Sequence, residues 1–386
     1  MKKMTRLLSG LLAGVMALGM TACGAEKKTV NADDKDVLLG EIGALTGQFA
    51  NYGISVKNGA QVAVDEINEA GGVNGWTFTL KVEDSQGDPD SAVSAFGKLM
   101  DDGMDVSLGC TMSGEAASVI ATAAKDNILI VTPSSSALNC IEANDKAFRI
   151  CFNDAAQGLA AADYIADHKL GSKIAICYQS DNDYSMGLYE TFVKESAERG
   201  LEIVEEQTFT EATATDFSTQ INAIRNSGCD LVLLPFYFTE AAKFLTQADG
   251  KLNDMVFFGC DGMDGIDSSI SDVALLEGLM MLTPFAANAG GNVQNFVDKY
   301  QAAYDAIPDQ FAADAYDAVY TVKTAMEHCG KTPADEDFTE AMVNAMYEIT
   351  VEGVTGTMQW GESREPVKDP KVMVFDAEGK TSPYEG

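Results

Sequence analysis

The chain has 386 residues, of which 46% are hydrophobic and 22% charged, a balance typical of a globular protein with a substantial core. Acidic residues outnumber basic ones 59 to 26, so the formal net charge is −33. A surface of that charge repels phosphate backbones, which excludes nucleic acid as an expected partner. The length predicts two lobes, or one large domain with insertions.

The first residues have the order of a secretory signal. Three basic residues within the first six precede an apolar run over 7–20, and Thr21-Ala22-Cys23 follows it. The run contains three glycines and is shorter than the ~20 apolar residues that a membrane-spanning helix needs. We therefore predict a signal peptide over 1–22.

Cys23 follows Met-Thr-Ala, a pattern that resembles the acylated cysteine of bacterial lipoproteins. That resemblance implies that Cys23 becomes a lipid-modified N-terminus and anchors the protein to the outer face of the cytoplasmic membrane. The alternative is an ordinary cleavage site with an incidental cysteine. Residues 23–36 are small, polar and charged, which predicts a flexible linker.

From residue 37 onward, short β-like runs alternate with helical patterns. In the first part we expect strands over 37–42, 77–83, 106–108 and 128–131, and helices over 55–70, 90–101 and 114–125. A second part repeats the alternation, with helices over 157–168, 186–199, 217–227 and 239–247, and strands over 173–178, 202–208, 230–234 and 255–258. Such alternation predicts mostly parallel sheets that are covered by helices on both faces.

The last part adds a strand over 277–285, helices over 293–304, 312–328 and 337–346, and strands over 356–360 and 371–375. These extra helices indicate that the chain returns to complete the first lobe. The predicted fold class is α/β, with two doubly wound parallel-sheet lobes joined by a multi-strand hinge. We place lobe I at 37–153 and 285–363, lobe II at 154–282 and 366–386, and hinges near Asn153, Pro284 and 363–365.

Sequence patterns of catalysis and of metal or cofactor binding are missing. Seven cysteines follow Cys23, but none forms a CxxC pair, and we expect most of them to be buried, reduced core thiols. The two histidines, His168 and His328, end helical patterns instead of lying in strand-end loops. No GxSxG elbow, complete P-loop or EF-hand loop is present. We expect a non-enzyme without cofactor or metal.

Hydroxyl, aromatic and acidic side chains follow the predicted strands. Ser113 lies after the strand over 106–108, and Thr132-Pro133-Ser134-Ser135-Ser136 follows the strand over 128–131. In the second half Tyr184, Tyr237 and Asp261 lie at corresponding strand ends. Ligands of parallel sheets bind beyond these ends, where helix N-termini favour anions. The combination predicts a site with anion-binding groups on one lobe and an acid on the other.

Seven segments together resemble the type I periplasmic-type binding proteins of the leucine/isoleucine/valine-binding class. They are GALTGQFANYG (43–53), NGAQVAVDEINEAGGVNG (58–75), EDSQGDP (83–89), LGCTMSG (108–114), ILIVTPSSS (128–136), FFGCDG (257–262) and VTGTMQW (354–360). The resemblance covers the chain from residue 37 and implies a bilobal fold that closes on a free amino acid.

Matched motif by motif, the resemblance also implies roles for single residues. Ser113 and Ser136 hold the ligand carboxylate through hydroxyl and backbone N–H groups. The Ser134 carbonyl and the Ser136 hydroxyl meet the ammonium group, which pairs with Asp261 from the other lobe. Tyr52, Tyr184 and Tyr237 match aromatic positions that flank the ligand. The expected wall of the pocket consists of Phe49, Tyr52, Met112, Tyr184, Phe236 and Tyr237.

The sequence thus predicts the extracytoplasmic substrate-binding component of an ABC importer for a branched-chain or other apolar α-amino acid. Its expected partners are the amino acid, an ABC permease with its ATPase subunits, and the membrane through the lipid anchor, and we expect a monomer. The alternative is a sensor of the same fold that reports the ligand to a membrane receptor. Neighbouring permease or receptor genes would separate the two.

Overall fold

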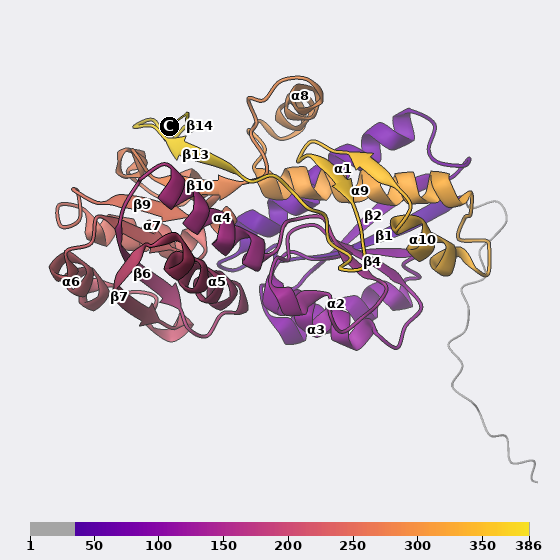
Figure 1. Cartoon of the computed structure of the whole chain (residues 1–386). Helices are drawn as coiled ribbons and strands as arrows, with labels where there is room; N and C mark the ends of the chain where they lie inside the picture. The colour runs from indigo at the N-terminus through magenta and orange to yellow at the C-terminus, as the bar shows by residue number, and fades with distance from the viewer. Residues whose placement is uncertain (1–34, 386) are drawn as a thin grey trace, which may run out of the picture.

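A computed structural model describes residues 35–385. The predicted signal peptide, Cys23 and the linker up to residue 34 lie outside the described residues. The first strand, β1 (Asp36–Gly43), begins at the last residue of the predicted linker. Two α/β lobes lie side by side (Figure 1), each built on its own sheet.

The first lobe contains a five-stranded, fully parallel sheet in the order β2-β1-β3-β4-β5. Its other strands are β2 (Thr77–Asp84), β3 (Val106–Cys110), β4 (Leu129–Thr132) and β5 (Ala147–Arg149). Its helices are α1 (Ala50–Glu69), α2 (Pro89–Asp101), α3 (Ser113–Ala123), α9 (Gln310–Cys329) and α10 (Phe338–Met346). α8 (Asn292–Tyr304) packs against α1.

Alternating residues of β4 explain why this sheet carries helices on both faces. Leu129 and Val131 belong to the core that α1 and α9 cover, whereas Ile128 and Ile130 belong to the core under α2 and α3. Successive strand residues point to opposite faces, so an uninterrupted apolar run needs helices on both sides. The predicted doubly wound class is confirmed.

The second lobe has a seven-stranded sheet in the order β14-β13-β10-β9-β8-β6-β7. Its parallel strands are β6 (Lys173–Gln179), β7 (Glu202–Phe209), β8 (Leu231–Leu234), β9 (Val256–Gly259) and β10 (Met280–Thr283). Its helices are α4 (Asp154–Asp167), α5 (Asp183–Arg199), α6 (Ser218–Ser227) and α7 (Phe238–Ala248).

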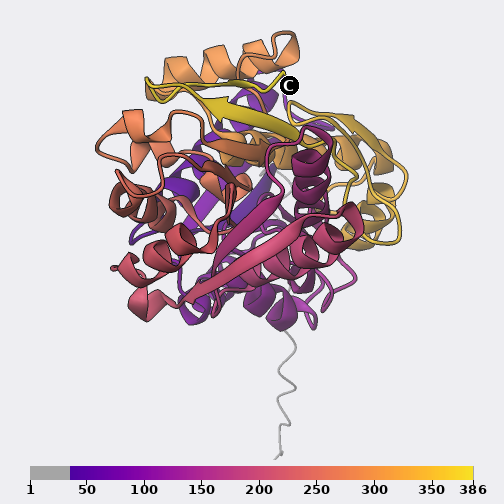
Figure 2. The same ribbon diagram turned by 60° about the vertical axis from the view of Figure 1, so that its left-hand side comes forward.

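The C-terminal strands β13 (Lys371–Phe375) and β14 (Thr381–Pro383) add to this sheet in antiparallel orientation (Figure 2). The chain therefore passes between the lobes after β5, after β10, and again before β13. The exact lobe boundaries and hinge positions given above stay predictions. The expected strand over 356–360 is β12 (Thr357–Gln359), which forms a two-stranded antiparallel sheet with β11 (Thr350–Glu352).

A glycine sets the close approach of α1 to α9. A Cβ atom added at Gly59 would lie 1.9 Å from the Ala312 carbonyl oxygen of α9. Alanine normally favours a helix over glycine by about 0.5–1 kcal/mol. We expect Gly59→Ala instead to lower the free energy of unfolding by about 1–3 kcal/mol, because the helices must separate. Urea unfolding measures this change.

Gly97 in α2 provides the matched control for that substitution, since an added Cβ atom meets nothing within 4 Å there. Gly97→Ala should leave the protein unchanged or stabilise it by about 0.5–1 kcal/mol. A loss of stability in both variants, or in neither, would contradict the proposed α1–α9 constraint.

Candidate functional site

A small cavity lies between the two lobes and has contributions from both. Its non-atom space is about 240 Å³, and its lining residues are Tyr52, Thr111, Met112, Ser113, Ser134, Ser136, Tyr184, Tyr237, Asp261, Gly262 and Phe311. All eight residues that the sequence predicted for ligand binding are in this set. The cavity lies beyond the carboxyl ends of strands in both sheets, where ligands of such sheets bind.

The first-lobe wall is formed where β3 runs into α3 and β4 runs into the following loop. Ser113 opens α3, so the first N–H groups of that helix have no intrahelical acceptor. The Ser113 hydroxyl oxygen accepts hydrogen bonds from the backbone N–H groups of Ser136 and Ala137, each at 3.2 Å. The Ser136 N–H, which the resemblance assigned to the ligand, is therefore used within the loop.

These hydrogen bonds determine which further partners the serine hydroxyls can bind. A hydroxyl has one donor and two acceptor positions. Both acceptor positions of Ser113 are occupied, so its hydrogen remains to be donated. Ser134 Oγ instead donates to the Thr111 carbonyl at 2.8 Å, so its acceptor positions remain. The wall thus offers a donor at Ser113 and an acceptor at Ser134.

Arg149 holds this loop in place and was not singled out from the sequence. The arginine is fully buried on β5, and its guanidinium donates to the carbonyls of Ser136 at 2.6 Å and Ala137 at 3.0 Å. Its Nε lies 3.2 Å from a Glu365 carboxylate oxygen in the segment that leads to β13. The buried Arg149 side chain thereby connects the loop that contains Ser136 and Ala137 to the segment in which the chain crosses from one lobe to the other. An arginine in a β-like run gives no sequence signal for such a contact.

The second-lobe wall centres on Asp261, directly after β9. The Tyr184 hydroxyl donates to Asp261 Oδ1 at 2.8 Å and accepts the Gly262 N–H at 2.8 Å. Burial raises the pKa of Asp261 to about 7, although hydrogen bonds from Tyr184, Gln157 and Gln310 oppose that rise. None of the groups that shift this pKa is positively charged. The carboxyl therefore lacks a cation of its own in the part of the chain that the structure describes.

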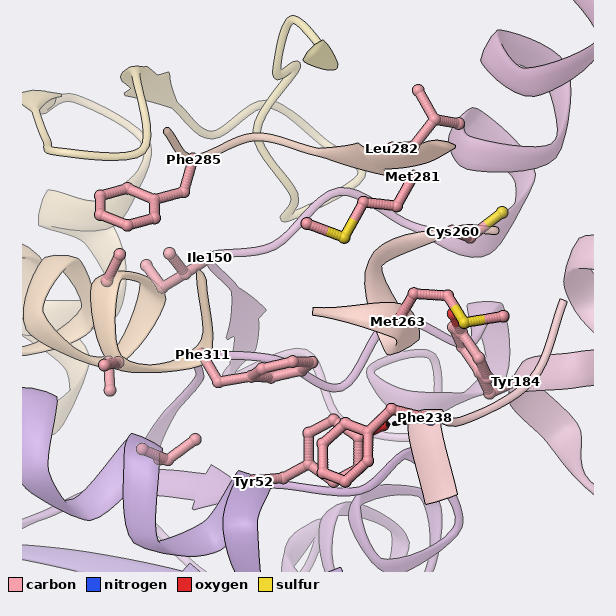
Figure 3. Packing of buried hydrophobic residues seen from close by; sticks show 14 of the residues in the cluster. Tyr52, Ile150, Tyr184, Phe238, Cys260, Met263, Met281, Leu282, Phe285 and Phe311 are labelled. Carbon is pink, nitrogen blue, oxygen red and sulfur yellow. Dashed lines mark hydrogen bonds between the residues drawn. The ribbon is translucent and has the colours of Figure 1, made fainter. Parts of the chain in front are cut away.

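Aromatic rings cover the remaining sides of the cavity. Tyr237 stacks on Tyr184 with a centroid separation of 4.7 Å and an angle of 7°. Tyr52 packs against Phe238 at 4.2 Å and against Phe311 at 4.6 Å (Figure 3). Phe311 is the second residue of α9 and was not expected at the site, because it lies just before the predicted helix over 312–328 and follows no predicted strand.

Two expected wall residues are placed elsewhere. Phe236 packs among Phe209, Phe217 and Phe244 in the second-lobe core, so its assignment to the pocket wall is wrong. Phe49 does not line the cavity, and its ring contacts the lining residue Tyr237 edge-on at a centroid separation of 5.3 Å. Residues just after a strand can point into the core as well as into the cleft, and the sequence pattern does not distinguish these directions.

The Tyr52 hydroxyl joins the two lobes directly. Tyr52 belongs to α1 of the first lobe, yet its hydroxyl donates to the Gly262 carbonyl at 2.6 Å and accepts the Phe238 N–H at 2.9 Å. Further bonds between the lobes link Thr239 to Gln48, Asn51 to Ser268, Gln310 to Asp264 and Asn139 to Asp183. The described structure is therefore a closed arrangement.

A family model described as periplasmic binding protein matches residues 37–380. The chain belongs to this family. A leucine-, isoleucine-, valine-, threonine- and alanine-binding protein of Pseudomonas aeruginosa is 28% identical over 370 residues, 94% of each chain. The Leu/Ile/Val-binding protein homolog 3 of Brucella melitensis is 26% identical over 343 residues, 88% of this chain and 91% of that one.

Solved structures agree with this assignment to the leucine/isoleucine/valine-binding class. The branched-chain amino acid transporter substrate-binding protein LivJ of Streptococcus pneumoniae, in complex with isoleucine, is 27% identical. It superimposes with a TM-score of 0.83 over 90% of this chain and 98% of its own. A Rhodopseudomonas palustris solute-binding protein in complex with benzoate, at 20% identity and a TM-score of 0.81 over 90% of this chain and 95% of its own, shares the fold.

Membership makes this periplasmic binding protein an extracytoplasmic solute-binding protein and not an enzyme. Within residues 35–385, no helix has the length and apolar character needed to cross a bilayer. Six of the seven cysteines after Cys23 are buried, as expected, and Cys329 is partly exposed.

Proposed function

We propose that this periplasmic binding protein is the substrate-binding component of an ABC importer and binds an α-amino acid between its lobes. One observation carries the proposal: Ser113 at the start of α3 and Asp261 of the other lobe line the same cavity. A zwitterion needs donors for its carboxylate and an acceptor for its ammonium, and it is strongly disfavoured in a buried site without them.

The ligand carboxylate would lie against α3. The Ser113 hydroxyl retains only its donor, and the first N–H groups of the helix and its positive dipole end favour an anion. The ammonium group would face Asp261, with the remaining acceptor position of Ser134 and the Ser136 hydroxyl beside it. Because these groups belong to different lobes, only the closed protein satisfies both ends of the ligand.

The ligand side chain would lie among Tyr52, Met112 and Phe311. These apolar walls support the branched-chain or other apolar amino acids expected from the sequence. Relatives named for leucine, isoleucine and valine support the same class. The protein would deliver the amino acid to an ABC permease and its ATPase subunits. It would act as a monomer that is anchored to the membrane through a lipid on Cys23.

A thermal-shift screen against the twenty amino acids tests this proposal, with benzoate and glucose as controls. A ligand present at 100 times its dissociation constant adds ~2.7 kcal/mol to stability. We expect the largest shift from a branched or apolar amino acid and none from the controls. A response to benzoate or glucose alone would replace the amino-acid proposal with another ligand class.

The raised pKa of Asp261 makes binding depend on pH. With a pKa of about 7 in the closed arrangement without ligand, the Asp261 carboxyl is protonated in acid, whereas an ammonium ligand keeps it ionised. Binding below pH 7 must therefore release a proton, and we expect the dissociation constant to rise about tenfold per pH unit. Calorimetry in two buffers of different ionisation enthalpy measures both effects. A dissociation constant that stays flat from pH 8 to pH 5 would argue against the Asp261–ammonium pair.

Removal of the Tyr52 hydroxyl should weaken ligand binding because it destabilises the closed state of the two lobes. Tyr52→Phe leaves the Phe238 N–H and the Gly262 carbonyl without their partner in the closed state. An unpaired buried group costs about 1–3 kcal/mol. We expect amino-acid affinity to fall at least about fivefold, mainly through faster dissociation measured by stopped-flow fluorescence. Unchanged dissociation kinetics would show that this hydroxyl does not limit opening.

A further inference from the structure

Thr111 is a polar cavity residue, and within residues 35–385 its hydroxyl has no hydrogen-bond partner. It follows β3 and precedes the anion-binding start of α3, and only 3% of the residue is exposed. Its backbone N–H donates to the Ile42 carbonyl, and its own carbonyl accepts the Ser134 hydroxyl. Among the residues that the structure describes, none forms a hydrogen bond with Thr111 Oγ1, which is buried.

An unpaired buried hydroxyl costs about 1–3 kcal/mol, and native proteins rarely retain one without a reason. Other hydroxyls of the cavity have partners of their own: Tyr52 bonds to Gly262 and Phe238, and the Ser134 hydrogen is donated to the Thr111 carbonyl. The remaining donor of Ser113 and acceptor positions of Ser134 are those assigned to the charged ends of the ligand. Thr111 lines the proposed ligand cavity, so a ligand is the partner that remains to be supplied.

We propose that Thr111 determines specificity by selecting an α-amino acid whose short side chain carries a hydroxyl group, as in threonine. This proposal rests on the amino-acid function proposed above, and it shifts the expected ligand from a purely apolar side chain to a branched one that carries a hydroxyl group. A hydroxyl on the ligand Cβ lies one carbon away from the Cα that carries both charged groups, and Thr111 lines the same cavity as Ser113, two residues further along the chain. The second branch of such a side chain, a methyl group, suits the apolar walls of Tyr52 and Phe311.

The small size of the site supports a short side chain. The lining residues leave about 240 Å³ of non-atom space, part of which is open to solvent, so the closed site has room only for a small ligand. Threonine and valine have nearly the same shape, so the difference between their affinities measures the contribution of the hydroxyl group. Valine would place a methyl group against Thr111 Oγ1 and shield it from water, which leaves the hydroxyl unpaired. A hydrogen bond between neutral groups favours threonine over valine by roughly three- to tenfold.

Calorimetric titration of threonine and valine against the wild type, Thr111→Val and Thr111→Ser tests the assignment. We expect threonine to bind the wild type at least about threefold more tightly than valine. Thr111→Val, which preserves the shape of the side chain, should abolish or reverse this ratio, and Thr111→Ser should preserve it. The melting temperature and valine binding of Thr111→Val show whether that variant folds and closes.

Two results would overturn the Thr111 proposal alone: valine binding the wild type as tightly as threonine, or a threonine/valine ratio that Thr111→Val leaves unchanged. In either case the protein still binds amino acids. If no amino acid binds the wild type, the proposed function fails and the Thr111 assignment fails with it. The screen described above separates these cases before the variants are made.

Discussion

Replacement of Asp261 by alanine or asparagine is expected to weaken amino-acid binding more than tenfold. Removing one partner of a buried, hydrogen-bonded charge pair costs roughly 2–5 kcal/mol. The free protein should respond in the opposite direction. Burial raises the pKa of Asp261 to about 7, so its charge is costly when no ligand is present. Asp261→Asn should therefore keep or increase the melting temperature of the free protein while binding is lost.

Asp154 offers a matched control for this experiment. It is also a fully buried aspartate of the second lobe, but it does not line the cavity. Burial raises the pKa of Asp154 well above its ordinary value, and the neighbouring Asp261 carboxyl raises it further. We expect Asp154→Asn to change amino-acid affinity less than about threefold. Calorimetry with the amino acid that gives the largest thermal shift measures both variants, and equal losses in the two would contradict the assignment of the ammonium site to Asp261.

Lys368→Met is expected to be the most destabilising of the substitutions considered. The ammonium group of Lys368 is fully buried 2.8 Å from Asp314 Oδ1 and also donates to the Thr355 hydroxyl. The Asp317 carboxylate accepts N–H groups of Val354 and Thr355 in the same cluster. Loss of the cation leaves two buried carboxyl groups without a counter-charge, and we expect the free energy of unfolding to fall by about 3–5 kcal/mol.

Lys323 on α9 provides the control for this substitution. Its ammonium group lies 2.7 Å from Glu327 one turn along the helix, and both side chains are partly exposed. Surface pairs of this kind contribute about 0–1 kcal/mol, so Lys323→Met should change urea unfolding little. A Lys368→Met variant that unfolds at the wild-type urea concentration would show that the buried pair is replaceable by an apolar side chain.

The alternation of apolar runs predicted most of the fold. Each predicted strand and helix has a counterpart, because strands buried on both faces and helices with one apolar face leave clear periodic patterns. β5, β11 and β14 were not predicted: each has three residues, which gives little room for a periodic pattern, although β12 of the same length was predicted. Their positions depend on pairing with neighbours that are distant in sequence.

The site residues were predicted by motif, but their hydrogen bonds were not. The sequence placed Ser113, Ser136 and Asp261 at strand ends, and the structure brings them to one cavity. It could not show that the Ser136 N–H is taken by Ser113, or that Arg149 supports the loop. Those contacts join residues 13 to 23 positions apart through tertiary packing, for which no local pattern exists.

The hydrogen bonds between the lobes have a consequence for ligand release. Tyr52, Thr239, Asn51, Gln310 and Asn139 each form such a bond without contributing a charged group to the cavity. These contacts add to the barrier that a bound molecule must overcome to escape, whatever its side chain. Residence time is thereby partly uncoupled from ligand chemistry, so two amino acids that bind with different strengths can leave at similar rates. A membrane protein that binds both lobes and breaks these interlobe hydrogen bonds would therefore release either amino acid.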